Sequence, residues 1–329
     1  MKSYVVRCGA FAFGVGILMG SVAAADRQEA QPAPKSLPNS RAEIYKKIGE
    51  VELPIHIFEP ANHRPGDRRP AIVFFFGGGW RGGSPAQFQH QCEYLASRGM
   101  VAMTAEYRVL SRHGVKAVSC FRDAKSAMRW VRKNAERLGV DPDRLAAGGG
   151  SAGGHLAGAL GTIRDFDEAG EDTSISAVPN ALVLFNPALV LAPVEGHGEK
   201  EWDRLGSLEE RMGVKPERLS PYHHVREGRP PTIIFHGRDD TTVPYLTSEL
   251  FAEKMKEKGN RCELVGYPGQ THGFFNYGRA DNTCFIDTVK KMDAFLVSLG
   301  YLEGSERIEA FLRQQSFSNH LTSLDRTSQ

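Results

Sequence analysis

Short apolar runs alternate along the chain with longer amphipathic stretches, a pattern that predicts a sheet covered by helices. Apolar runs with few polar positions predict buried strands at residues 71–76, 100–107, 144–148, 181–185, 232–235 and 262–267. Helices are predicted between them at residues 85–98, 118–138, 154–160, 244–258 and 285–299. Strands that alternate with helices are typical of a mostly parallel central sheet with helices on both faces, that is, an α/β fold.

The segments around this core have different patterns. Residues 44–58 alternate apolar and polar side chains, which predicts an antiparallel hairpin at the start of the domain. Residues 187–230 carry mixed charge and few strand signals, so we expect a small cap insertion there, with a plain surface loop as the alternative. We assign residues 43–301 to one domain and residues 302–329 to a polar C-terminal tail.

The N-terminal residues 1–25 have the organisation of a signal peptide. Lys2 and Arg7 precede an apolar run that ends in three alanines, so cleavage is expected before Asp26. The mature protein would then be secreted or periplasmic, and an uncleaved membrane anchor is the alternative. Residues 26–42 are rich in proline, glutamine and charge and indicate a flexible leader. No second apolar run of comparable length follows, so no membrane span is expected in the mature protein.

Composition narrows the range of partners and of cysteine chemistry. The chain has 329 residues, of which 41% are hydrophobic, and a formal net charge of +2, which gives no reason to expect a nucleic-acid partner. Removal of the signal peptide leaves Cys92, Cys120, Cys262 and Cys284, and no cysteine spacing suggests zinc. Export permits disulfides. Cys262–Cys284 is the pairing that we favour, and free buried thiols are the alternative.

Residues 149–153, Gly-Gly-Ser-Ala-Gly, lie between a predicted strand and a predicted helix and indicate a nucleophile elbow. The tight turn requires nearly side-chain-free residues two before and two after Ser151, and glycine occupies both positions. The hydroxyl would be held at the N-terminus of a helix, which favours developing negative charge. A glycine-rich turn with a bystander serine is the alternative.

A serine hydroxyl needs a base held in the correct tautomer by an acid, and the chain offers these groups in the order serine, acid, histidine. Asp239 and Asp240 compete for the acid. We favour Asp240 because the Asp-x-x-Val-Pro pattern places it on the loop before the helix that Pro244 starts, and Asp239 is then expected to cap that loop.

The base candidate is His272, because it follows the last predicted strand and precedes the last predicted helix. The other histidines have simpler interpretations. His155 is expected to pack on the helix after the serine, His236 to be buried and hydrogen-bonded, and His223 and His224 to lie in the cap or on the surface.

Three glycines at residues 77–79 follow a buried strand and can present backbone N–H groups without side-chain obstruction. We expect backbone N–H groups of this glycine run, together with the N–H of Ala152, to form an oxyanion hole, which acyl transfer requires. A plain glycine turn is the alternative.

Together these motifs resemble the α/β-hydrolase superfamily, in the branch of hormone-sensitive-lipase-like carboxylesterases, acetyl esterases and xylan-esterase-like proteins. The matching segments are residues 76–80, 105–108, 123–127, 141–144, 149–154, 240–244 and 272–274. The resemblance implies a catalytic triad of Ser151, Asp240 and His272 and an oxyanion hole of Gly78, Gly79 and Ala152.

One position departs from this family. The family usually has histidine at the head of the triple glycine, where this chain has Phe76, which cannot brace the loop through a side-chain hydrogen bond. The oxyanion donors are backbone groups, so their chemistry does not depend on that histidine. Tyr107, Arg108 and Asp123 are expected to brace the scaffold rather than to act on substrate.

The sequence therefore predicts an exported serine carboxylesterase that hydrolyses short-chain, acetyl-type esters, on acylated sugars or polysaccharides, without a metal or an organic cofactor. The expected partner is a small-molecule or carbohydrate ester. A serine peptidase of the prolyl-oligopeptidase kind is one alternative, although the chain lacks the large β-propeller usual in those enzymes. A non-catalytic binding protein on a hydrolase scaffold is the other.

Overall fold

The computed structural model describes residues 34–197 and 208–315 of the chain. The predicted signal peptide at residues 1–25, the leader as far as residue 33, residues 198–207 of the expected cap and the last part of the tail lie outside the described residues.

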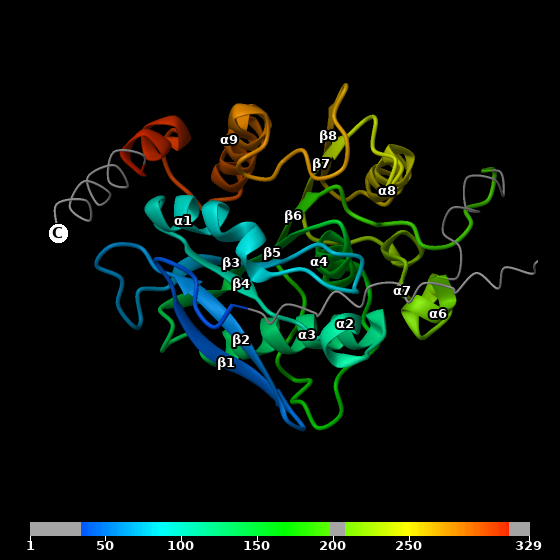
Figure 1. Cartoon of the computed structure of the whole chain (residues 1–329), viewed down its shortest axis with the longest axis horizontal. Helices are drawn as coiled ribbons and strands as arrows, with labels where there is room; N and C mark the ends of the chain where they lie inside the picture. Colours follow the sequence, from blue (N-terminus) through cyan, green and yellow to red (C-terminus); the bar gives the residue numbers. More distant parts are fainter. Residues whose placement is uncertain (1–33, 198–207, 316–329) are drawn as a thin grey trace, which may run out of the picture. The chain divides into compact units, whose positions relative to one another are not determined.

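Eight strands form one sheet in the order β1-β2-β4-β3-β5-β6-β7-β8 (Figure 1). Their bounds are Arg41–Ile48, Val51–Phe58, Arg69–Phe75, Val101–Ala105, Val140–Gly150, Ala181–Phe185, Thr232–Gly237 and Cys262–Tyr267 for β1 to β8. β1 pairs antiparallel with β2, and β2 with β4. The other neighbouring pairs are parallel. The predicted entry hairpin and the mostly parallel sheet are therefore confirmed.

Helices cover both faces of the sheet because each strand carries apolar side chains on both sides. α3 (Ala117–Lys133), α4 (Ala152–Thr162) and α8 (Tyr245–Glu257) pack in one apolar cluster with Val73 and Phe75 of β3. α1 (Gln89–Ser97) and α9 (Thr283–Ser298) pack in a second cluster with Ile72 and Phe74 of the same strand. In Figure 1, α1 and α9 lie above the sheet and α3 lies below it. The α/β fold class is confirmed.

The helix predicted at residues 118–138 ends earlier, at Lys133. The side chain of Asn134 turns back and donates to the carbonyl of Trp130 at 2.8 Å. The N–H of Leu138 then donates to the carbonyl of Asn134, so residues 134–139 form turns that lead into β5. Of the three residues expected on the inner face, Ala127 and Val131 are buried and Trp130 is only partly buried.

The described parts of residues 187–230 contain α6 (Leu208–Met212), α7 (Pro216–Leu219) and the 3₁₀ turn Pro221–His224. They pack onto the domain rather than extending from it. The ammonium of Lys254 on α8 lies 4.0 Å from the centre of the Tyr222 ring. The N–H of Tyr222 donates to the carbonyl of Leu189 at 3.0 Å.

The first part of the C-terminal tail packs on the domain. Ile308 is fully buried, and the ring of Phe311 meets that of Tyr94 on α1 at 5.7 Å between centres. Glu309 pairs with Lys290 on α9 at 2.6 Å. These contacts attach residues 302–315 to the face that α1 and α9 cover.

All four cysteines in the described part of the chain are free, so the favoured pairing of Cys262 with Cys284 is wrong. The two thiols belong to opposite faces of the sheet. Cys262, at the start of β8, packs with the α3, α4 and α8 cluster, whereas Cys284, at the start of α9, packs with the α1 and α9 cluster. The intervening sheet keeps the two sulfur atoms apart.

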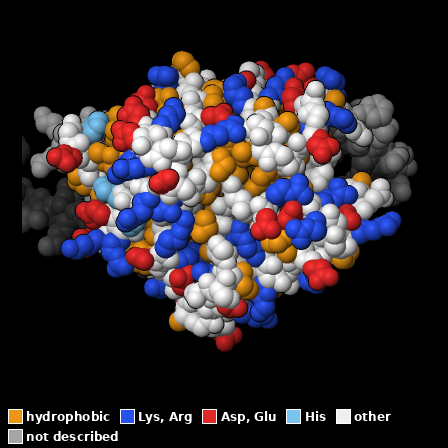
Figure 2. All heavy atoms as spheres, turned by 180° about the vertical axis from the view of Figure 1, so that it is seen from behind, with side chains coloured by type: hydrophobic (Ala, Val, Ile, Leu, Met, Phe, Trp, Pro, Cys, Tyr) orange, Lys and Arg blue, Asp and Glu red, His pale blue; other side chains and the backbone are white. Residues whose placement is uncertain are grey.

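The described residues contain no membrane-spanning helix, and the rear face of the molecule carries both signs of charge. Among the described residues, no helix is long and apolar enough to cross a bilayer. Figure 2 shows basic and acidic side chains interspersed over the rear face, with scattered apolar side chains between them. This mixture agrees with the small net charge of +2.

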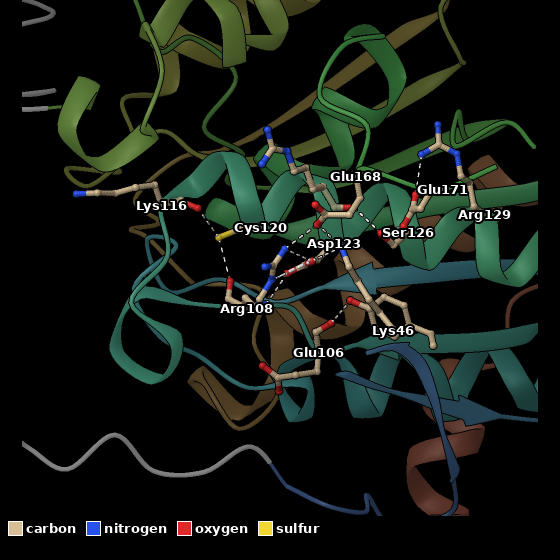
Figure 3. A network of polar contacts seen from close by, with 12 residues as sticks. Lys46, Glu106, Arg108, Lys116, Cys120, Asp123, Ser126, Arg129, Glu168 and Glu171 are labelled. Atoms are coloured by element: carbon tan, nitrogen blue, oxygen red, sulfur yellow. Dashed lines mark hydrogen bonds and ion pairs between the residues drawn. The ribbon is translucent and has the colours of Figure 1, made fainter. Parts of the chain in front are cut away.

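A buried network of polar side chains fixes the segment that follows β4 (Figure 3). The fully buried carboxylate of Asp123 accepts from Lys46 at 2.7 Å, from the guanidinium of Arg108 at 2.8 Å and from the N–H of Arg108 at 3.0 Å. Glu168 bridges the same two cations at 2.7 and 2.9 Å. Because each buried charge has partners of opposite sign, the network holds the backbone of Arg108 in place.

Glu106 is also buried here, and one of its carboxylate oxygens has no hydrogen-bond partner among the described residues. Burial raises the pKa of Glu106 to about 7, against the pairing with Arg112 that lowers it. The folded protein therefore retains a proton on Glu106 that the unfolded chain loses near pH 4.5. Its stability decreases as the pH rises from about 4.5 to about 7.

We expect Glu106→Gln to abolish this part of the pH dependence. Between pH 5 and pH 8 the native protein should lose roughly 2–3 kcal/mol of unfolding free energy relative to the variant. Urea unfolding of both proteins across this pH range measures the difference. Glu52→Gln, at an exposed carboxylate on neighbouring β2, is the matched control and should track the native protein. Parallel curves for Glu106→Gln and the native protein would show that Glu106 is ionised throughout.

Candidate active site

Ser151 lies on a strained turn between β5 and α4. Its backbone has φ 53° and ψ −117°, a conformation that costs a non-glycine residue on the order of 1–3 kcal/mol. Backbone hydrogen bonds hold the turn. The N–H of Ser151 donates to the carbonyl of Phe185 at 2.8 Å, and its carbonyl accepts from the N–H of His155 at 2.9 Å.

Close backbone contacts at the turn explain the flanking glycines. A methyl group on Gly149 would lie 2.5 Å from the backbone of Gly153, and one on Gly153 would lie 2.0 Å from the carbonyl oxygen of Phe75. Both distances are shorter than real Cβ contacts allow. The turn thus has the steric requirement that the spacing around Ser151 predicts.

His272, on the loop after β8, connects the hydroxyl of Ser151 with a carboxylate. Its Nε2 lies 2.9 Å from the Oγ of Ser151, and its Nδ1 lies 2.7 Å from Oδ2 of Asp240. A carboxylate only accepts hydrogen bonds, so Nδ1 carries the proton. Nε2 therefore presents its lone pair to the serine hydroxyl. The three residues form one continuous hydrogen-bonded chain.

Asp240, on the loop after β7, is held as a carboxylate by several donors. The N–H groups of Thr242 and Val243 donate to Oδ1 at 2.8 and 2.9 Å, and the side chain of Asn186 donates to Oδ2 at 2.8 Å. Burial alone would raise the pKa of Asp240. Hydrogen bonds from His236, His272 and the backbone of Val243 outweigh burial and hold that pKa far below its usual value.

The structure brings Asp240, and not Asp239, to His272. Asp239 is exposed, and its N–H donates to the carbonyl of Gln270 at 3.1 Å. Asn186 was not predicted as a donor to Asp240. Its position directly after a buried strand was the available signal, because side chains at the carboxyl ends of parallel strands share one edge of the sheet.

The triple glycine lies beside the serine. A methyl group on Gly77 would come within 3.3 Å of the Cβ of Ser151. Gly78 has φ 125° and Gly79 φ 61°, both in the region that favours glycine. Within the described part of the chain, nothing accepts a hydrogen bond from the N–H of Gly78 or Gly79. Ala152 is the first residue of α4, so its N–H has no partner within the helix.

Tyr107 braces the start of the glycine loop through its contacts with Phe76. Its ring stacks on that of Phe76 with 4.1 Å between centres and 15° between planes. Its hydroxyl donates to the carbonyl of Phe76 at 2.7 Å. The neighbouring Arg108 belongs to the network around Asp123 (Figure 3), which fixes the backbone that carries Tyr107.

A second brace links the glycine turn with the loop of His272. The side chain of Gln87 accepts from the N–H of Gly77 at 2.6 Å and donates to Asn276 at 3.0 Å. Asn276 in turn donates to the carbonyl of Gly273, the residue after His272, at 2.9 Å. Neither Gln87 nor Asn276 has a sequence signal, because their contact joins segments 189 residues apart.

We expect Tyr107→Phe to lower the kcat for ester hydrolysis by about tenfold with little change in KM. The variant keeps the stacked ring but leaves the carbonyl of Phe76 without its donor, which loosens the turn that carries Gly78 and Gly79. Tyr94→Phe is the matched control, because it removes another buried hydroxyl, one that donates to Asp293 on α9. Steady-state kinetics and thermal unfolding of both variants test this brace. An equal fall of kcat in both variants would contradict it.

His155 links the glycine turn to the cap segment. The indole N–H of Trp80 donates to Nδ1 of His155 at 3.2 Å, so Nε2 carries the proton and donates to the carbonyl of Leu219 at 2.7 Å. Burial lowers the pKa of His155 to about 4, and the ring is neutral at ordinary pH. His155 is thus a buried packing residue, as expected.

The other three histidines considered in the sequence also have structural partners. His236 is fully buried and meets Ser248 and the carbonyl of Val243, at 2.7 and 2.9 Å. His223 and His224 lie on the 3₁₀ turn of the cap segment. Over residues 34–197 and 208–315, no group of three or more His, Cys, Asp or Glu side chains is placed to hold a metal ion.

Comparison with known proteins gives a consistent set of matches. The BD-FAE family model matches residues 55–255. The structure of esterase 2 of Thermogutta terrifontis with propionate bound is 54% identical, with a TM-score of 0.77, and the match covers 82% of this chain and 97% of that one. The same esterase phosphonylated by sarin is 52% identical, with a TM-score of 0.78, and the match covers 82% and 98% of the two chains.

Curated relatives match over part of their length. Esterase LipC of Mycobacterium tuberculosis is 30% identical over 224 residues, which are 62% of this chain and 53% of LipC. The acetylxylan esterase of Xylanibacter ruminicola is 27% identical over 210 residues, which are 62% of this chain and 41% of that protein. The chain thus spans about half the length, or less, of these curated relatives.

Proposed function

Because the chain belongs to the BD-FAE family, in the carboxylesterase branch of the α/β-hydrolases, we propose that it is an exported serine carboxylesterase for short-chain, acetyl-type esters. The observation that carries this proposal is the continuous hydrogen-bonded chain from Ser151 through His272 to Asp240. The chain of hydrogen bonds stands beside backbone N–H groups that no described residue uses.

In the proposed mechanism, Ser151 Oγ attacks the ester carbonyl carbon while Nε2 of His272 takes its proton. The carbonyl oxygen becomes an oxyanion, which the N–H groups of Gly78, Gly79 and Ala152 stabilise. When the intermediate collapses, the bond to the alcohol oxygen breaks, and His272 gives its proton to the leaving alcohol. The acyl group is now bound to Ser151.

Water then completes the cycle. His272 takes a proton from a water molecule, which attacks the acyl carbon, and the second oxyanion collapses to release the acid and restore the serine hydroxyl. Asp240 keeps the proton on Nδ1 of His272 throughout and stabilises the imidazolium formed in each half-reaction. The low pKa of Asp240 favours this role, because the carboxylate stays ionised at neutral pH.

Two observations support a short acyl group and a sugar-borne ester. The related esterase of Thermogutta terrifontis has been crystallised with propionate, a three-carbon acid, and a curated relative is an acetylxylan esterase. The signal-peptide pattern at residues 1–25 supports export, which would bring the protein to polysaccharides outside the cell.

A panel of 4-nitrophenyl esters from acetate to decanoate, together with acetylated xylan and a feruloyl ester, tests the substrate class. We expect kcat/KM to be highest for acyl groups of about two to four carbons and to fall at least about tenfold by decanoate. N-terminal sequencing of the protein from fractionated cells tests export, and the mature chain should begin at Asp26.

The same assays separate the alternatives. Faster hydrolysis of a dipeptide amide than of acetyl esters would identify a serine peptidase. A folded protein that fails to react with a fluorophosphonate would be a binding protein on a hydrolase scaffold. The sarin adduct of the related esterase leads us to expect that Ser151 reacts.

A further inference from the structure

A small cavity of about 110 Å³ opens beside the glycine turn. Three apolar side chains form part of its lining: Trp80, Leu110 and Val115. Most of the other lining residues are cationic: Arg81, Lys116 and Arg211. The cavity therefore combines an apolar wall with an excess of positive charge.

The single carboxylate among the lining residues does not neutralise this charge. Glu210 lies 3.7 Å from the ammonium of Lys116, and its side chain is 79% exposed, so the pair is weak. Arg81 and Arg211 form no ion pair with any residue in the described ranges. Arg81 is also exposed to solvent. Two guanidinium groups are thus available to an anionic ligand.

Two residues that line the cavity follow the triple glycine directly in the chain. Trp80 directly follows Gly79, and the N–H of Arg81 donates to the carbonyl of Gly78 at 3.0 Å. Such a four-residue turn keeps its first and last Cα atoms within about 7 Å. The turn is also fixed against α2 (Leu110–His113). The N–H of Leu110 donates to the carbonyl of Trp80 at 3.1 Å, and the N–H of Ser111 donates to the carbonyl of Arg81 at 2.9 Å. Arg81 therefore starts within a side chain's reach of the proposed oxyanion donors.

We propose that this cavity binds a carboxylate carried by the ester substrate, so that the preferred substrates are anionic esters. The proposal rests on the proposed function, because it places the ester carbonyl at Gly78 and Gly79. A guanidinium group binds a carboxylate through two parallel hydrogen bonds, which suits Arg81. The apolar wall of Trp80, Leu110 and Val115 accommodates the carbon skeleton that joins the carboxylate to the ester. An acidic sugar or a dicarboxylic acyl group has this chemistry.

Matched pairs of esters test the proposal and distinguish the two sources of the carboxylate. The first pair is mono-4-nitrophenyl adipate and its methyl ester, in which the acyl part carries the charge. The second is 4-acetoxybenzoate and its methyl ester, in which the alcohol part carries it. The readout is the charge preference, that is, kcat/KM for the acid divided by kcat/KM for its methyl ester.

We expect Arg81→Gln to lower the charge preference about tenfold for at least one pair, and Lys116→Gln to lower it for the same pair. Arg81→Lys should retain most of it. The control Arg226→Gln removes an exposed positive charge on the loop before β7 and should leave the preference at the native value. High salt should weaken the native preference, since the interaction is electrostatic.

An unchanged preference in both Arg81→Gln and Lys116→Gln, in proteins that still hydrolyse the methyl esters, would overturn the proposed cavity function and leave the esterase intact. A native protein that hydrolyses no member of either pair, charged or neutral, would instead contradict the proposed function itself.

Discussion

A Ser151→Ala variant is expected to hydrolyse 4-nitrophenyl acetate on the order of 10⁵-fold more slowly than the native protein. The loss is large because the hydroxyl is the proposed nucleophile, and the oxyanion donors alone cannot form the acyl-enzyme. Alanine and serine both carry a Cβ, so the strained turn costs them about the same and folding should be preserved. Burst kinetics with 4-nitrophenyl acetate and labelling with a fluorophosphonate measure the loss.

Ser97→Ala is the matched control, since it removes an exposed hydroxyl that donates to the carbonyl of Tyr94 on the far helix α1. Its kcat should stay within about twofold of the native value. A fall of less than tenfold in folded Ser151→Ala, free of contaminating esterases, would show that another group attacks the ester.

The neighbouring aspartates should differ sharply when each is replaced by asparagine. Asp240→Asn is expected to lower kcat by about 10⁴-fold, because an amide next to Nδ1 no longer fixes the proton there and no longer stabilises the imidazolium. Asp239→Asn should stay within about twofold, because that side chain is exposed and does not contact His272. The two substitutions change the same atoms in adjacent residues, so each is the control for the other.

Steady-state kinetics and thermal unfolding of both variants provide the measurement. The reverse ranking of the two variants would assign the acid to Asp239.

The convergence of the three proposed site residues was predictable because their positions follow from the strand pattern. Ser151, Asp240 and His272 each follow a strand of the parallel part of the sheet, namely β5, β7 and β8. Parallel neighbours present their carboxyl ends at one edge, so the order of strands was enough to expect convergence. Local steric requirements were informative too, since the two glycines around Ser151 indicated a tight turn.

The supporting contacts were not predictable from pattern alone. Gln87 and Asn276 meet only because the 3₁₀ helix Pro85–Phe88 folds against a loop near the end of the domain, and neither has a neighbour in sequence that indicates the other. Tyr107 was expected to brace the scaffold, but its partner Phe76 was not identified, because stacking depends on the relative placement of two strands. Such contacts follow from tertiary structure and do not alter hydrophobic periodicity.

The error over the cysteines has a simple physical origin. Side chains alternate between the two faces of a strand, and Cys262 shares its face with Leu264, while Val265 and Tyr267 point to the side where Cys284 lies. Proximity in sequence to the same site therefore gave no information about proximity of the sulfur atoms. The alternation of side chains along β8 would have indicated that the two cysteines lie on opposite faces of the sheet.

The strand order also determines when the protein can first act on a substrate. The histidine is 121 residues beyond the serine, on the loop after the outermost strand of the sheet. A nascent chain contains the serine turn long before it contains the proposed base, and closing so long a loop slows the formation of their contact. Regain of catalysis after dilution from denaturant should consequently lag behind regain of helical circular dichroism.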